Sequence, residues 1–208
     1  MRIAEKVEAL DLSFMFGGRS ASIHPLLLWS GEEGATLVDT GFPGQFAALE
    51  KAITECGVAM ADVRTVIITH QEIDHIGNLP EVVRAGGARV LAHAEEVPYI
   101  QGERPLIKAD PQRLEKMLRF LSEEQRAHTL RLFTQPPTAF VDQRLADNEE
   151  LPLHGGLRVL HTPGHTPGHV CLYVAACRLL VSGDELRVEN GELLGPGAGR
   201  RLAALAAE

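Results

Sequence analysis

The first half of the chain contains four short apolar runs. They occupy residues 24–29 (HPLLLW), 35–39 (ATLVD), 63–69 (VRTVIIT) and 88–94 (ARVLAHA), and each has the length and composition of a strand. The segment SGEEG between the first two runs has the composition of a hairpin turn. The third run is apolar and largely β-branched, which is typical of a strand covered on both faces.

Helical spacing appears between these strands. The apolar residues Phe46, Leu49 and Ile53 recur on one helical face, and Gly57 stands where that helix should end. The segment LPEVVRAGG predicts a second, short helix with a glycine stop. Strands that alternate with helices in this way indicate an α/β layered fold.

The middle of the chain has a different pattern. Pro111 after Asp110 predicts a helix start, and Ser122 with Gln125 forms the signature of a capping box at the start of a second helix. We expect these helices to form an insert over about residues 97–135. Beyond it, the runs LRVLH, HVCLYVA and RLLVSG predict short strands, followed by a hairpin across the pair Asn190-Gly191.

Composition narrows the class of protein. A chain of 208 residues predicts a single domain, 1–208, with enough buried surface to fold without a disulfide. The net charge of −8 argues against nucleic acid and anionic membranes as partners. No run approaches a membrane span or a secretory signal, and Cys56, Cys171 and Cys177 lack CxxC spacing. We therefore expect a cytoplasmic protein with reduced thiols.

The segment THQEIDHIGN concentrates ligand-type side chains directly after the third apolar run. His70, Glu72, Asp74 and His75 fall within six positions. In layered α/β sheets, ligands bind at the carboxyl ends of the strands. If the segment stays extended, His70, Glu72 and Asp74 point one way and His75 another, which suits two metals. A solvated polar loop is the alternative, but this density of ligand types favours a metal site.

The segment HTPGHTPGH supplies further candidates. Its three histidines are spaced by four, but the Pro-Gly pairs exclude a helix. His165 lies between two turns and is a candidate ligand, whereas His161 and His169 are interpreted as strand-terminal side chains with local hydrogen bonds. Asp39 in LVDTG and Asp184 in LVSGDE each follow an apolar strand, where a turn or cap role is the alternative to a role at a metal site.

The motifs VDTG, THQEIDHIG, TPGHTPGH and SGD, in this order, resemble those of the metallo-β-lactamase superfamily. The resemblance covers roughly residues 24–195. The stretches HPLLLWSGEEGATLVDTGFPGQ and AHAEEVPYIQGERPLIK are similar to an uncharacterised bacterial subgroup of small metallo-hydrolases. The resemblance implies an αββα four-layer sandwich, here with the helical insert and a shortened C-terminal half. It also implies a dinuclear site, usually of zinc, at one edge of the two sheets.

Six residues match ligand positions of that family: His70, Glu72, His165, Asp74, His75 and Asp184. By the resemblance, the first three would hold one metal and the last three a second, with Asp184 bridging both. Asp39 matches a residue that orders the site from behind. The expected cofactor is zinc, up to two per chain, with iron or manganese as alternatives.

Two positions depart from the family pattern. Glu72 stands where the HxHxDH motif has its second histidine, and a carboxylate favours harder ions such as iron or manganese. This HxExDH variant also resembles the di-iron domain of flavodiiron proteins. In addition, no histidine follows His169, where the family usually has one more ligand. We expect a less complete second site, and an unpaired sheet edge that would support a homodimer.

The sequence thus predicts a metal-dependent hydrolase. Its metals would activate a water that attacks an ester, lactone, thioester or related bond of a small molecule. Asp74 would orient the water and accept its proton. No GxSxG motif offers a serine alternative. Two other functions stay open, namely a di-iron redox or oxygen-handling domain and a metal-poor, degenerate binding module.

Overall fold

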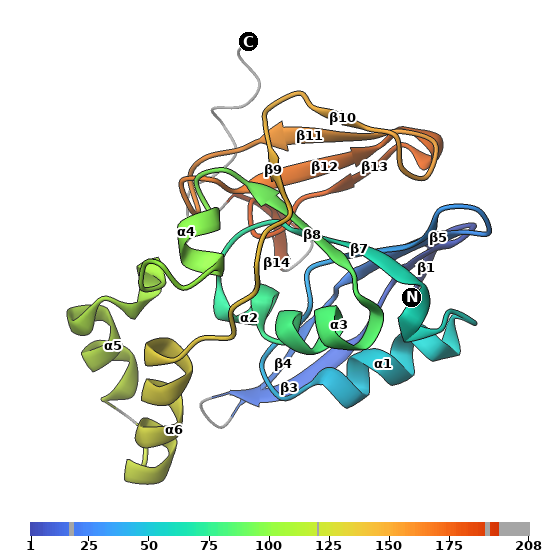
Figure 1. Ribbon diagram of the computed structural model, residues 1–208. Coiled ribbons are helices and arrows are strands. Elements are labelled where there is room, and N and C mark those ends of the chain that lie inside the picture. Colours follow the sequence, from blue (N-terminus) through green and yellow to red (C-terminus); the bar gives the residue numbers. More distant parts are fainter. Residues whose placement is uncertain (17–18, 120, 190–191, 196–208) are drawn as a thin grey trace.

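Two sheets face each other in the computed structural model, which describes residues 1–16, 19–119, 121–189 and 192–195 (Figure 1). The larger sheet has the strand order β1-β2-β5-β6-β7-β8-β9. Its strands are β1 (Arg2–Ala4), β2 (Val7–Ala9), β5 (Leu26–Ser30), β6 (Gly34–Val38), β7 (Val63–Ile68), β8 (Arg89–His93) and β9 (Gln143–Leu145). The smaller sheet contains β10 (Glu150–Leu151), β11 (Leu157–His161), β12 (Val170–Val174) and β13 (Leu179–Val181).

The centre of the large sheet is parallel. Strands β6, β7, β8 and β9 pair in parallel, so their carboxyl ends meet at one edge. Strands β5 and β6 form the antiparallel hairpin predicted across SGEEG. Two further hairpins lie outside the main sheets: β3 (Leu12–Phe16) with β4 (Arg19–Ile23), and β14 (Arg187–Glu189) with β15 (Glu192–Leu194). The last pairing agrees with the predicted hairpin, although its turn, Asn190-Gly191, lies outside the described residues.

Helices cover the outer face of the large sheet (Figure 1). Helix α1 (Phe46–Glu55) ends just before Gly57. The φ of Gly57 is 79°, a conformation that glycine adopts readily because it has no Cβ. Helix α3 (Leu79–Gly86) ends at Gly87 in the left-handed conformation. A 3-10 turn, η1 (Met60–Asp62), leads into β7, and one helical turn, α2 (Ile73–Ile76), follows it. The predicted alternation of strand and helix is confirmed.

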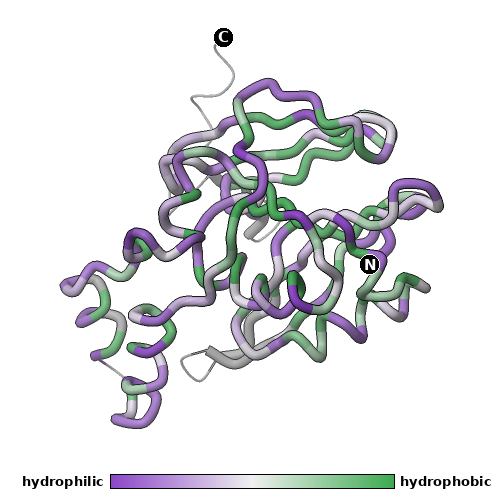
Figure 2. The backbone as a smooth tube through the Cα atoms, viewed as in Figure 1, coloured by the Kyte–Doolittle hydropathy of each residue, from purple (hydrophilic) through white to green (hydrophobic). Residues whose placement is uncertain are grey.

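Two apolar clusters hold these layers together. One lies between the large sheet and its helices and includes Leu37, Leu49 and Ile68. The other lies between the two sheets and includes Ile67 and Leu172. Consecutive residues of β7 therefore contribute to different clusters, which confirms that this strand is covered on both faces. Figure 2 shows the hydrophobic colouring along the strands of both sheets.

The helical segment between β8 and β9 projects to one side of the sheets (Figure 1). It consists of α4 (Val97–Ile100), η2 (Ile107–Ala109), α5 (Pro111–Leu118) and α6 (Glu123–Thr134). Helix α6 begins with the predicted capping box, in which Ser122 Oγ accepts the N–H of Gln125 and the Gln125 side chain accepts the N–H of Ser122. Cys56, Cys171 and Cys177 are free, as expected.

The outer face of the small sheet carries exposed side chains. Tyr173 and Leu180 are cross-strand partners there, and they are 37% and 44% exposed. Strand β13 pairs with β12 alone among the described strands. Of the helices in the described part of the chain, none is long and apolar enough to cross a membrane.

Candidate metal centre

The candidate ligands gather where parallel strands end. Asp39 follows β6, and Thr69 and His70 follow β7, so the carboxyl-end edge of the large sheet presents all three. The backbone N–H of Val170, at the start of β12, donates to the Thr69 carbonyl at 3.1 Å. This bond joins the edges of the two sheets and brings the loop that carries His165 next to His70.

Four side chains converge at this junction. One ligand atom from each of His70, Glu72, His165 and Asp184 lies within 4.8 Å of the others. His165 Nε2 is 2.9 Å from a Glu72 oxygen and 3.4 Å from an Asp184 oxygen. His70 Nε2 is 4.0 Å from the nearest oxygens of both carboxylates. We refer to these four residues as the metal cluster.

Three imidazole nitrogens of this region are suited to bind a cation. The Nε2 atoms of His70, His75 and His165 are buried, and none has a hydrogen-bond partner within the described part of the chain. Carboxylate oxygens lie near two of them as ion-pair partners, Glu72 at 2.9 Å from His165 Nε2 and Asp184 at 3.3 Å from His75 Nε2. Buried polar atoms are normally hydrogen-bonded, so three such atoms beside carboxylates fit the coordination of a metal ion. Imidazole and carboxylate together suit zinc, iron or manganese.

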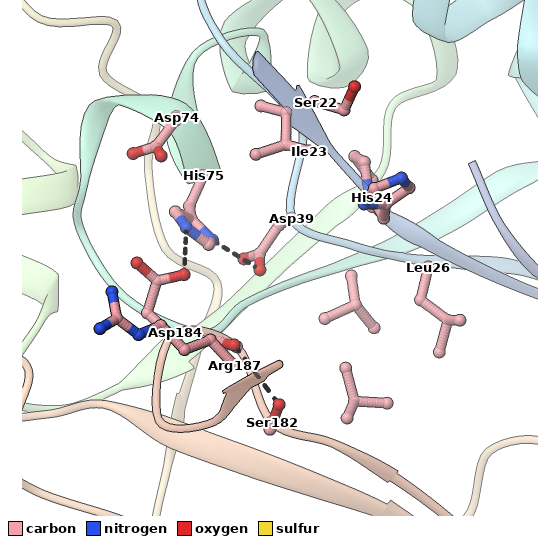
Figure 3. A pocket seen from close by; sticks show the side chains of 14 residues that line it. Ser22, Ile23, His24, Leu26, Asp39, Asp74, His75, Ser182, Asp184 and Arg187 are labelled. Carbon is pink, nitrogen blue, oxygen red and sulfur yellow. Dashed lines mark hydrogen bonds and ion pairs between the residues drawn. The ribbon is translucent and has the colours of Figure 1, made fainter. Parts of the chain in front are cut away.

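His75 stands between two carboxylates (Figure 3). Its Nδ1 lies 2.8 Å from Asp39 Oδ2, and its Nε2 lies 3.3 Å from Asp184 Oδ1. Burial alone would lower the pKa of His75, but the charges of Asp39 and Asp184 outweigh it and raise that pKa well above its usual range. Asp39 also accepts the N–H and hydroxyl of Thr69, so it orders the site from behind, as the resemblance implies.

Asp74 is not a member of the metal cluster. The extended conformation that would align it with His70 and Glu72 is absent, because Glu72 is the N-cap of α2 and the chain turns helical from Ile73. Asp74 instead lines a cleft of about 520 Å³ together with His75 and Asp184. Figure 3 shows it beside His75. Burial raises the pKa of the Asp74 carboxyl above its usual value.

The electrostatics of the cluster favour a neutral His70 and ionised carboxylates. Burial, and then the neighbouring histidines, lower the pKa of His70 well below its usual range. Burial would raise the pKa of Asp184, but the contact with His75 and the nearby cations lower it to about 2. Glu72 behaves similarly, because His165 and Lys108 outweigh its burial and lower its pKa. Neutral imidazole and carboxylate are the protonation states that metals bind.

His161 and His169 lie outside the metal cluster. His161 stacks on His93 with ring centroids 4.0 Å apart, and its Nε2 lies 2.9 Å from the Pro167 carbonyl. His169 is fully buried, and its Nε2 accepts the backbone N–H of Asp184 at 3.2 Å. The interpretation of both as residues with local hydrogen bonds agrees with these contacts. His169 also helps to position Asp184.

The turn after α2 is packed against the loop after β6. Thr40 donates its hydroxyl to the His75 carbonyl at 2.9 Å, and Asn78 donates its amide to the Thr40 carbonyl at 2.6 Å. A Cβ added to Gly77 would lie 2.3 Å from the Gly41 carbonyl oxygen. Only glycine permits this approach, so Gly77 fixes the position from which His75 projects.

Two residues of the site, Lys108 and Glu96, were not predicted from the sequence. The Lys108 ammonium, from η2, contacts the Glu72 carboxylate directly. Glu96, fully buried, accepts the N–H groups of Gln71 and Gly168, which belong to the two loops that carry ligands. Neither residue belongs to a motif with the spacing of metal ligands. The only sequence signal for Glu96 is the pair of acidic residues in AHAEEV.

Comparison with known proteins agrees with this geometry. The family model described as metallo-beta-lactamase superfamily matches residues 22–206. The probable metallo-hydrolase YflN of Bacillus subtilis is 25% identical over 189 residues, covering 86% of this chain and 69% of the relative. The probable metallo-hydrolase YybB of the same organism is 30% identical over 162 residues, covering 78% and 61%.

Solved structures share the fold. A metallo-β-lactamase with a HARLDQ motif from Cronobacter sakazakii has a TM-score of 0.61 at 21% identity, covering 83% of this chain and 58% of that one. The chain thus spans between 58% and 69% of the lengths of the proteins named here.

Proposed function

The chain belongs to the metallo-β-lactamase superfamily, and from that premise we propose that it is a metal-dependent hydrolase of a small molecule with an ester, lactone, thioester or related bond. The observation that carries the proposal is the convergence of unbonded imidazole nitrogens on two carboxylates. His70 and His165 present buried Nε2 atoms to Glu72 and Asp184 within a 4.8 Å cluster. A binding module without metal would leave these nitrogens unsatisfied.

The residues divide into two groups. His70, Glu72 and His165 would hold one metal, and Asp184 would share its carboxylate with a second metal held by His75 and Asp74. Asp184 suits a bridging role because its two oxygens face different histidines, Oδ2 facing His165 and Oδ1 facing His75. Bound metal ions supply Lewis-acid polarisation of the scissile bond and lower the pKa of a water to near neutrality.

The protein's own groups would orient and deprotonate the nucleophile. Asp74 lines the cleft beside His75, so its carboxylate suits the role of proton acceptor for a water held there. Asp39 keeps the His75 ring oriented through Nδ1, which leaves Nε2 directed at Asp184. The cleft, lined also by Leu26, would receive the substrate.

Metal analysis combined with a hydrolysis panel tests this function. The protein is purified without chelators, and its metals are counted per chain by elemental analysis. It is then assayed against matched lactone, oxoester and thioester substrates before and after chelation, with zinc, manganese or iron restored. We expect bound metal and a hydrolytic rate that disappears on chelation and returns with metal. A metal-free protein with no activity in any reconstituted form contradicts the proposal.

A di-iron redox function is the second candidate, and one observation favours it. Glu72 places a carboxylate oxygen inside the cluster, where the family motif has a histidine, and harder ligands favour iron. In that case the purified protein would contain about two irons per chain, absorb visible light and consume oxygen with an added electron donor. The same elemental analysis separates the two candidates.

A further inference from the structure

A lysine from the helical segment reaches into the metal cluster. Lys108 lies in η2 and its ammonium contacts the Glu72 carboxylate, which the proposed function assigns to the first metal. The other oxygen of Glu72 lies 2.9 Å from His165 Nε2, so the ammonium lies directly beside the metal cluster.

The backbone next to Lys108 is hydrogen-bonded to the loop that carries His70 and Glu72. The N–H of Ile107 donates to Gln71 Oε1 at 3.2 Å, and Leu106 is only 3% exposed. The Lys108 side chain, in contrast, is 35% exposed, whereas that of Glu72 is 6% exposed. An anchored backbone with a partly exposed, flexible side chain places the ammonium at the rim of the centre and allows it to move.

A metal in the cluster would remove the partner of this lysine. A divalent ion held by His70 and His165 attracts the Glu72 oxygens more strongly than a single ammonium does, and it repels that ammonium at short range. Because Gln71 still anchors η2, the lysine would stay at the rim without its carboxylate. A positive charge left in a half-buried position binds an anion well, since charge-assisted hydrogen bonds are among the strongest in proteins.

We propose that Lys108 anchors a negatively charged group of the substrate, a carboxylate or a phosphate, after the metal displaces its ammonium from Glu72. This inference rests on the proposed hydrolase function and specifies its substrate class as anionic. The cleft meets the cluster at Asp184, whereas Lys108 meets it at Glu72. A substrate would therefore extend from the cleft across the metals, with its charged group at Lys108.

Two thiols of similar length test this inference without knowledge of the substrate. The protein is loaded with cobalt(II) and titrated with 3-mercaptopropionate or with 3-mercapto-1-propanol. Both thiolates bind cobalt and produce a charge-transfer band, but only the first thiol carries a carboxylate. We expect the wild-type chain to bind the acid about tenfold more tightly than the alcohol, which corresponds to one additional ionic contact.

Three variants distinguish the effect of Lys108 from that of the overall charge of the protein. Lys108→Met should still bind cobalt and the alcohol, but lose the preference for the acid. Lys108→Arg should retain part of the preference. Lys116→Met removes an exposed lysine of α5 and should retain all of it.

Three results would overturn the inference. The wild type could bind both thiols equally, Lys108→Met could retain the preference, or Lys108→Met could fail to bind cobalt, which would make Lys108 a support of the metal site. In the first two cases cobalt is bound, so the hydrolase proposal survives. A wild-type chain that takes up no cobalt contradicts both proposals at once.

Discussion

Glu96 and Gly168 are joined by a 2.7 Å hydrogen bond between a buried carboxylate oxygen and a backbone N–H. The second oxygen of Glu96 accepts the N–H of Gln71 at 2.9 Å. Gln71 lies between His70 and Glu72, and Gly168 lies three residues after His165. A single carboxylate therefore fixes both loops that supply the candidate ligands, although Glu96 is not in the metal cluster.

We predict that Glu96→Gln weakens metal binding without removing a ligand. The amide retains one acceptor, but its NH2 group would face one of the two backbone donors. Loss of a residue that holds ligands in place typically costs roughly 10- to 100-fold in metal affinity. Competition with a chelator of known affinity measures the effect. Glu95→Gln, at the neighbouring exposed position, is the control and should bind metal as the wild type does. Equal affinities in all three proteins would contradict this role of Glu96.

The sequence predicted the elements that have local signals. The apolar run of β7, the glycine after α1 and the capping box at Ser122 each depend on a few adjacent residues, and each was found where expected. The family motifs placed His70, Glu72, His165 and Asp184, which the fold brings together. The resemblance supplied this set, whereas the position of Asp184 after a strand was by itself also compatible with a turn or cap role.

What the sequence did not predict depends on long-range packing. The extended conformation considered for the segment does not continue to Asp74, because α2 begins at Ile73 and has only four residues, too few for a periodic signal. Lys108 and Glu96 reach the site from a segment whose position depends on packing against the ligand loops. The antiparallel pairing of β3 with β4 was not predicted either.

The three histidines of HTPGHTPGH should differ in their effect on metal content. His165→Ala removes a member of the cluster and should lose more metal than substitution of any supporting residue. His161→Ala should have little effect, because His161 contacts His93 and Pro167 instead. His169→Ala should be intermediate, since it removes the acceptor of the Asp184 N–H. Elemental analysis of the three purified variants measures this order, and equal losses would show that the assignment is wrong.

Substitution of Glu72 by histidine should change the preferred metal. Imidazole suits zinc, whereas carboxylate suits harder ions, so Glu72→His should shift selectivity from iron or manganese toward zinc. The substitution also removes the partner of Lys108. The measurement is the metal content of both proteins after reconstitution with an equimolar mixture of the three ions. Unchanged selectivity would show that Glu72 is not a ligand.

An alanine at Gly77 should destabilise the whole ligand loop. Its Cβ would approach the Gly41 carbonyl oxygen to 2.3 Å and the Pro43 nitrogen to 2.4 Å, and neither backbone atom can move independently. Overpacking of this kind typically lowers the free energy of unfolding by about 1–3 kcal/mol or more. Chemical denaturation measures it. Gly31→Ala, where an added Cβ meets nothing within 4 Å, is the control. A Gly77→Ala protein as stable as this control would contradict the close packing.

The two proposed metals should differ in affinity. At the first site, the four ligand atoms of His70, Glu72, His165 and Asp184 already lie within 4.8 Å of one another. At the second, His75 Nε2 lies 3.3 Å from Asp184 Oδ1, Asp74 lies outside the metal cluster, and Asp184 must be shared. Fewer converging ligands mean that water or an anion must complete the coordination, which usually lowers retention.

Titration of the metal-free protein with zinc, in competition with chelators of graded strength, should therefore resolve one tight and one weak site. His75→Ala should abolish the weak site and leave the tight one, because His75 Nε2 faces Asp184 Oδ1, whereas the other carboxylate oxygen faces His165. Two metals bound with equal affinity, or loss of both in His75→Ala, would show that the ions share one inseparable site.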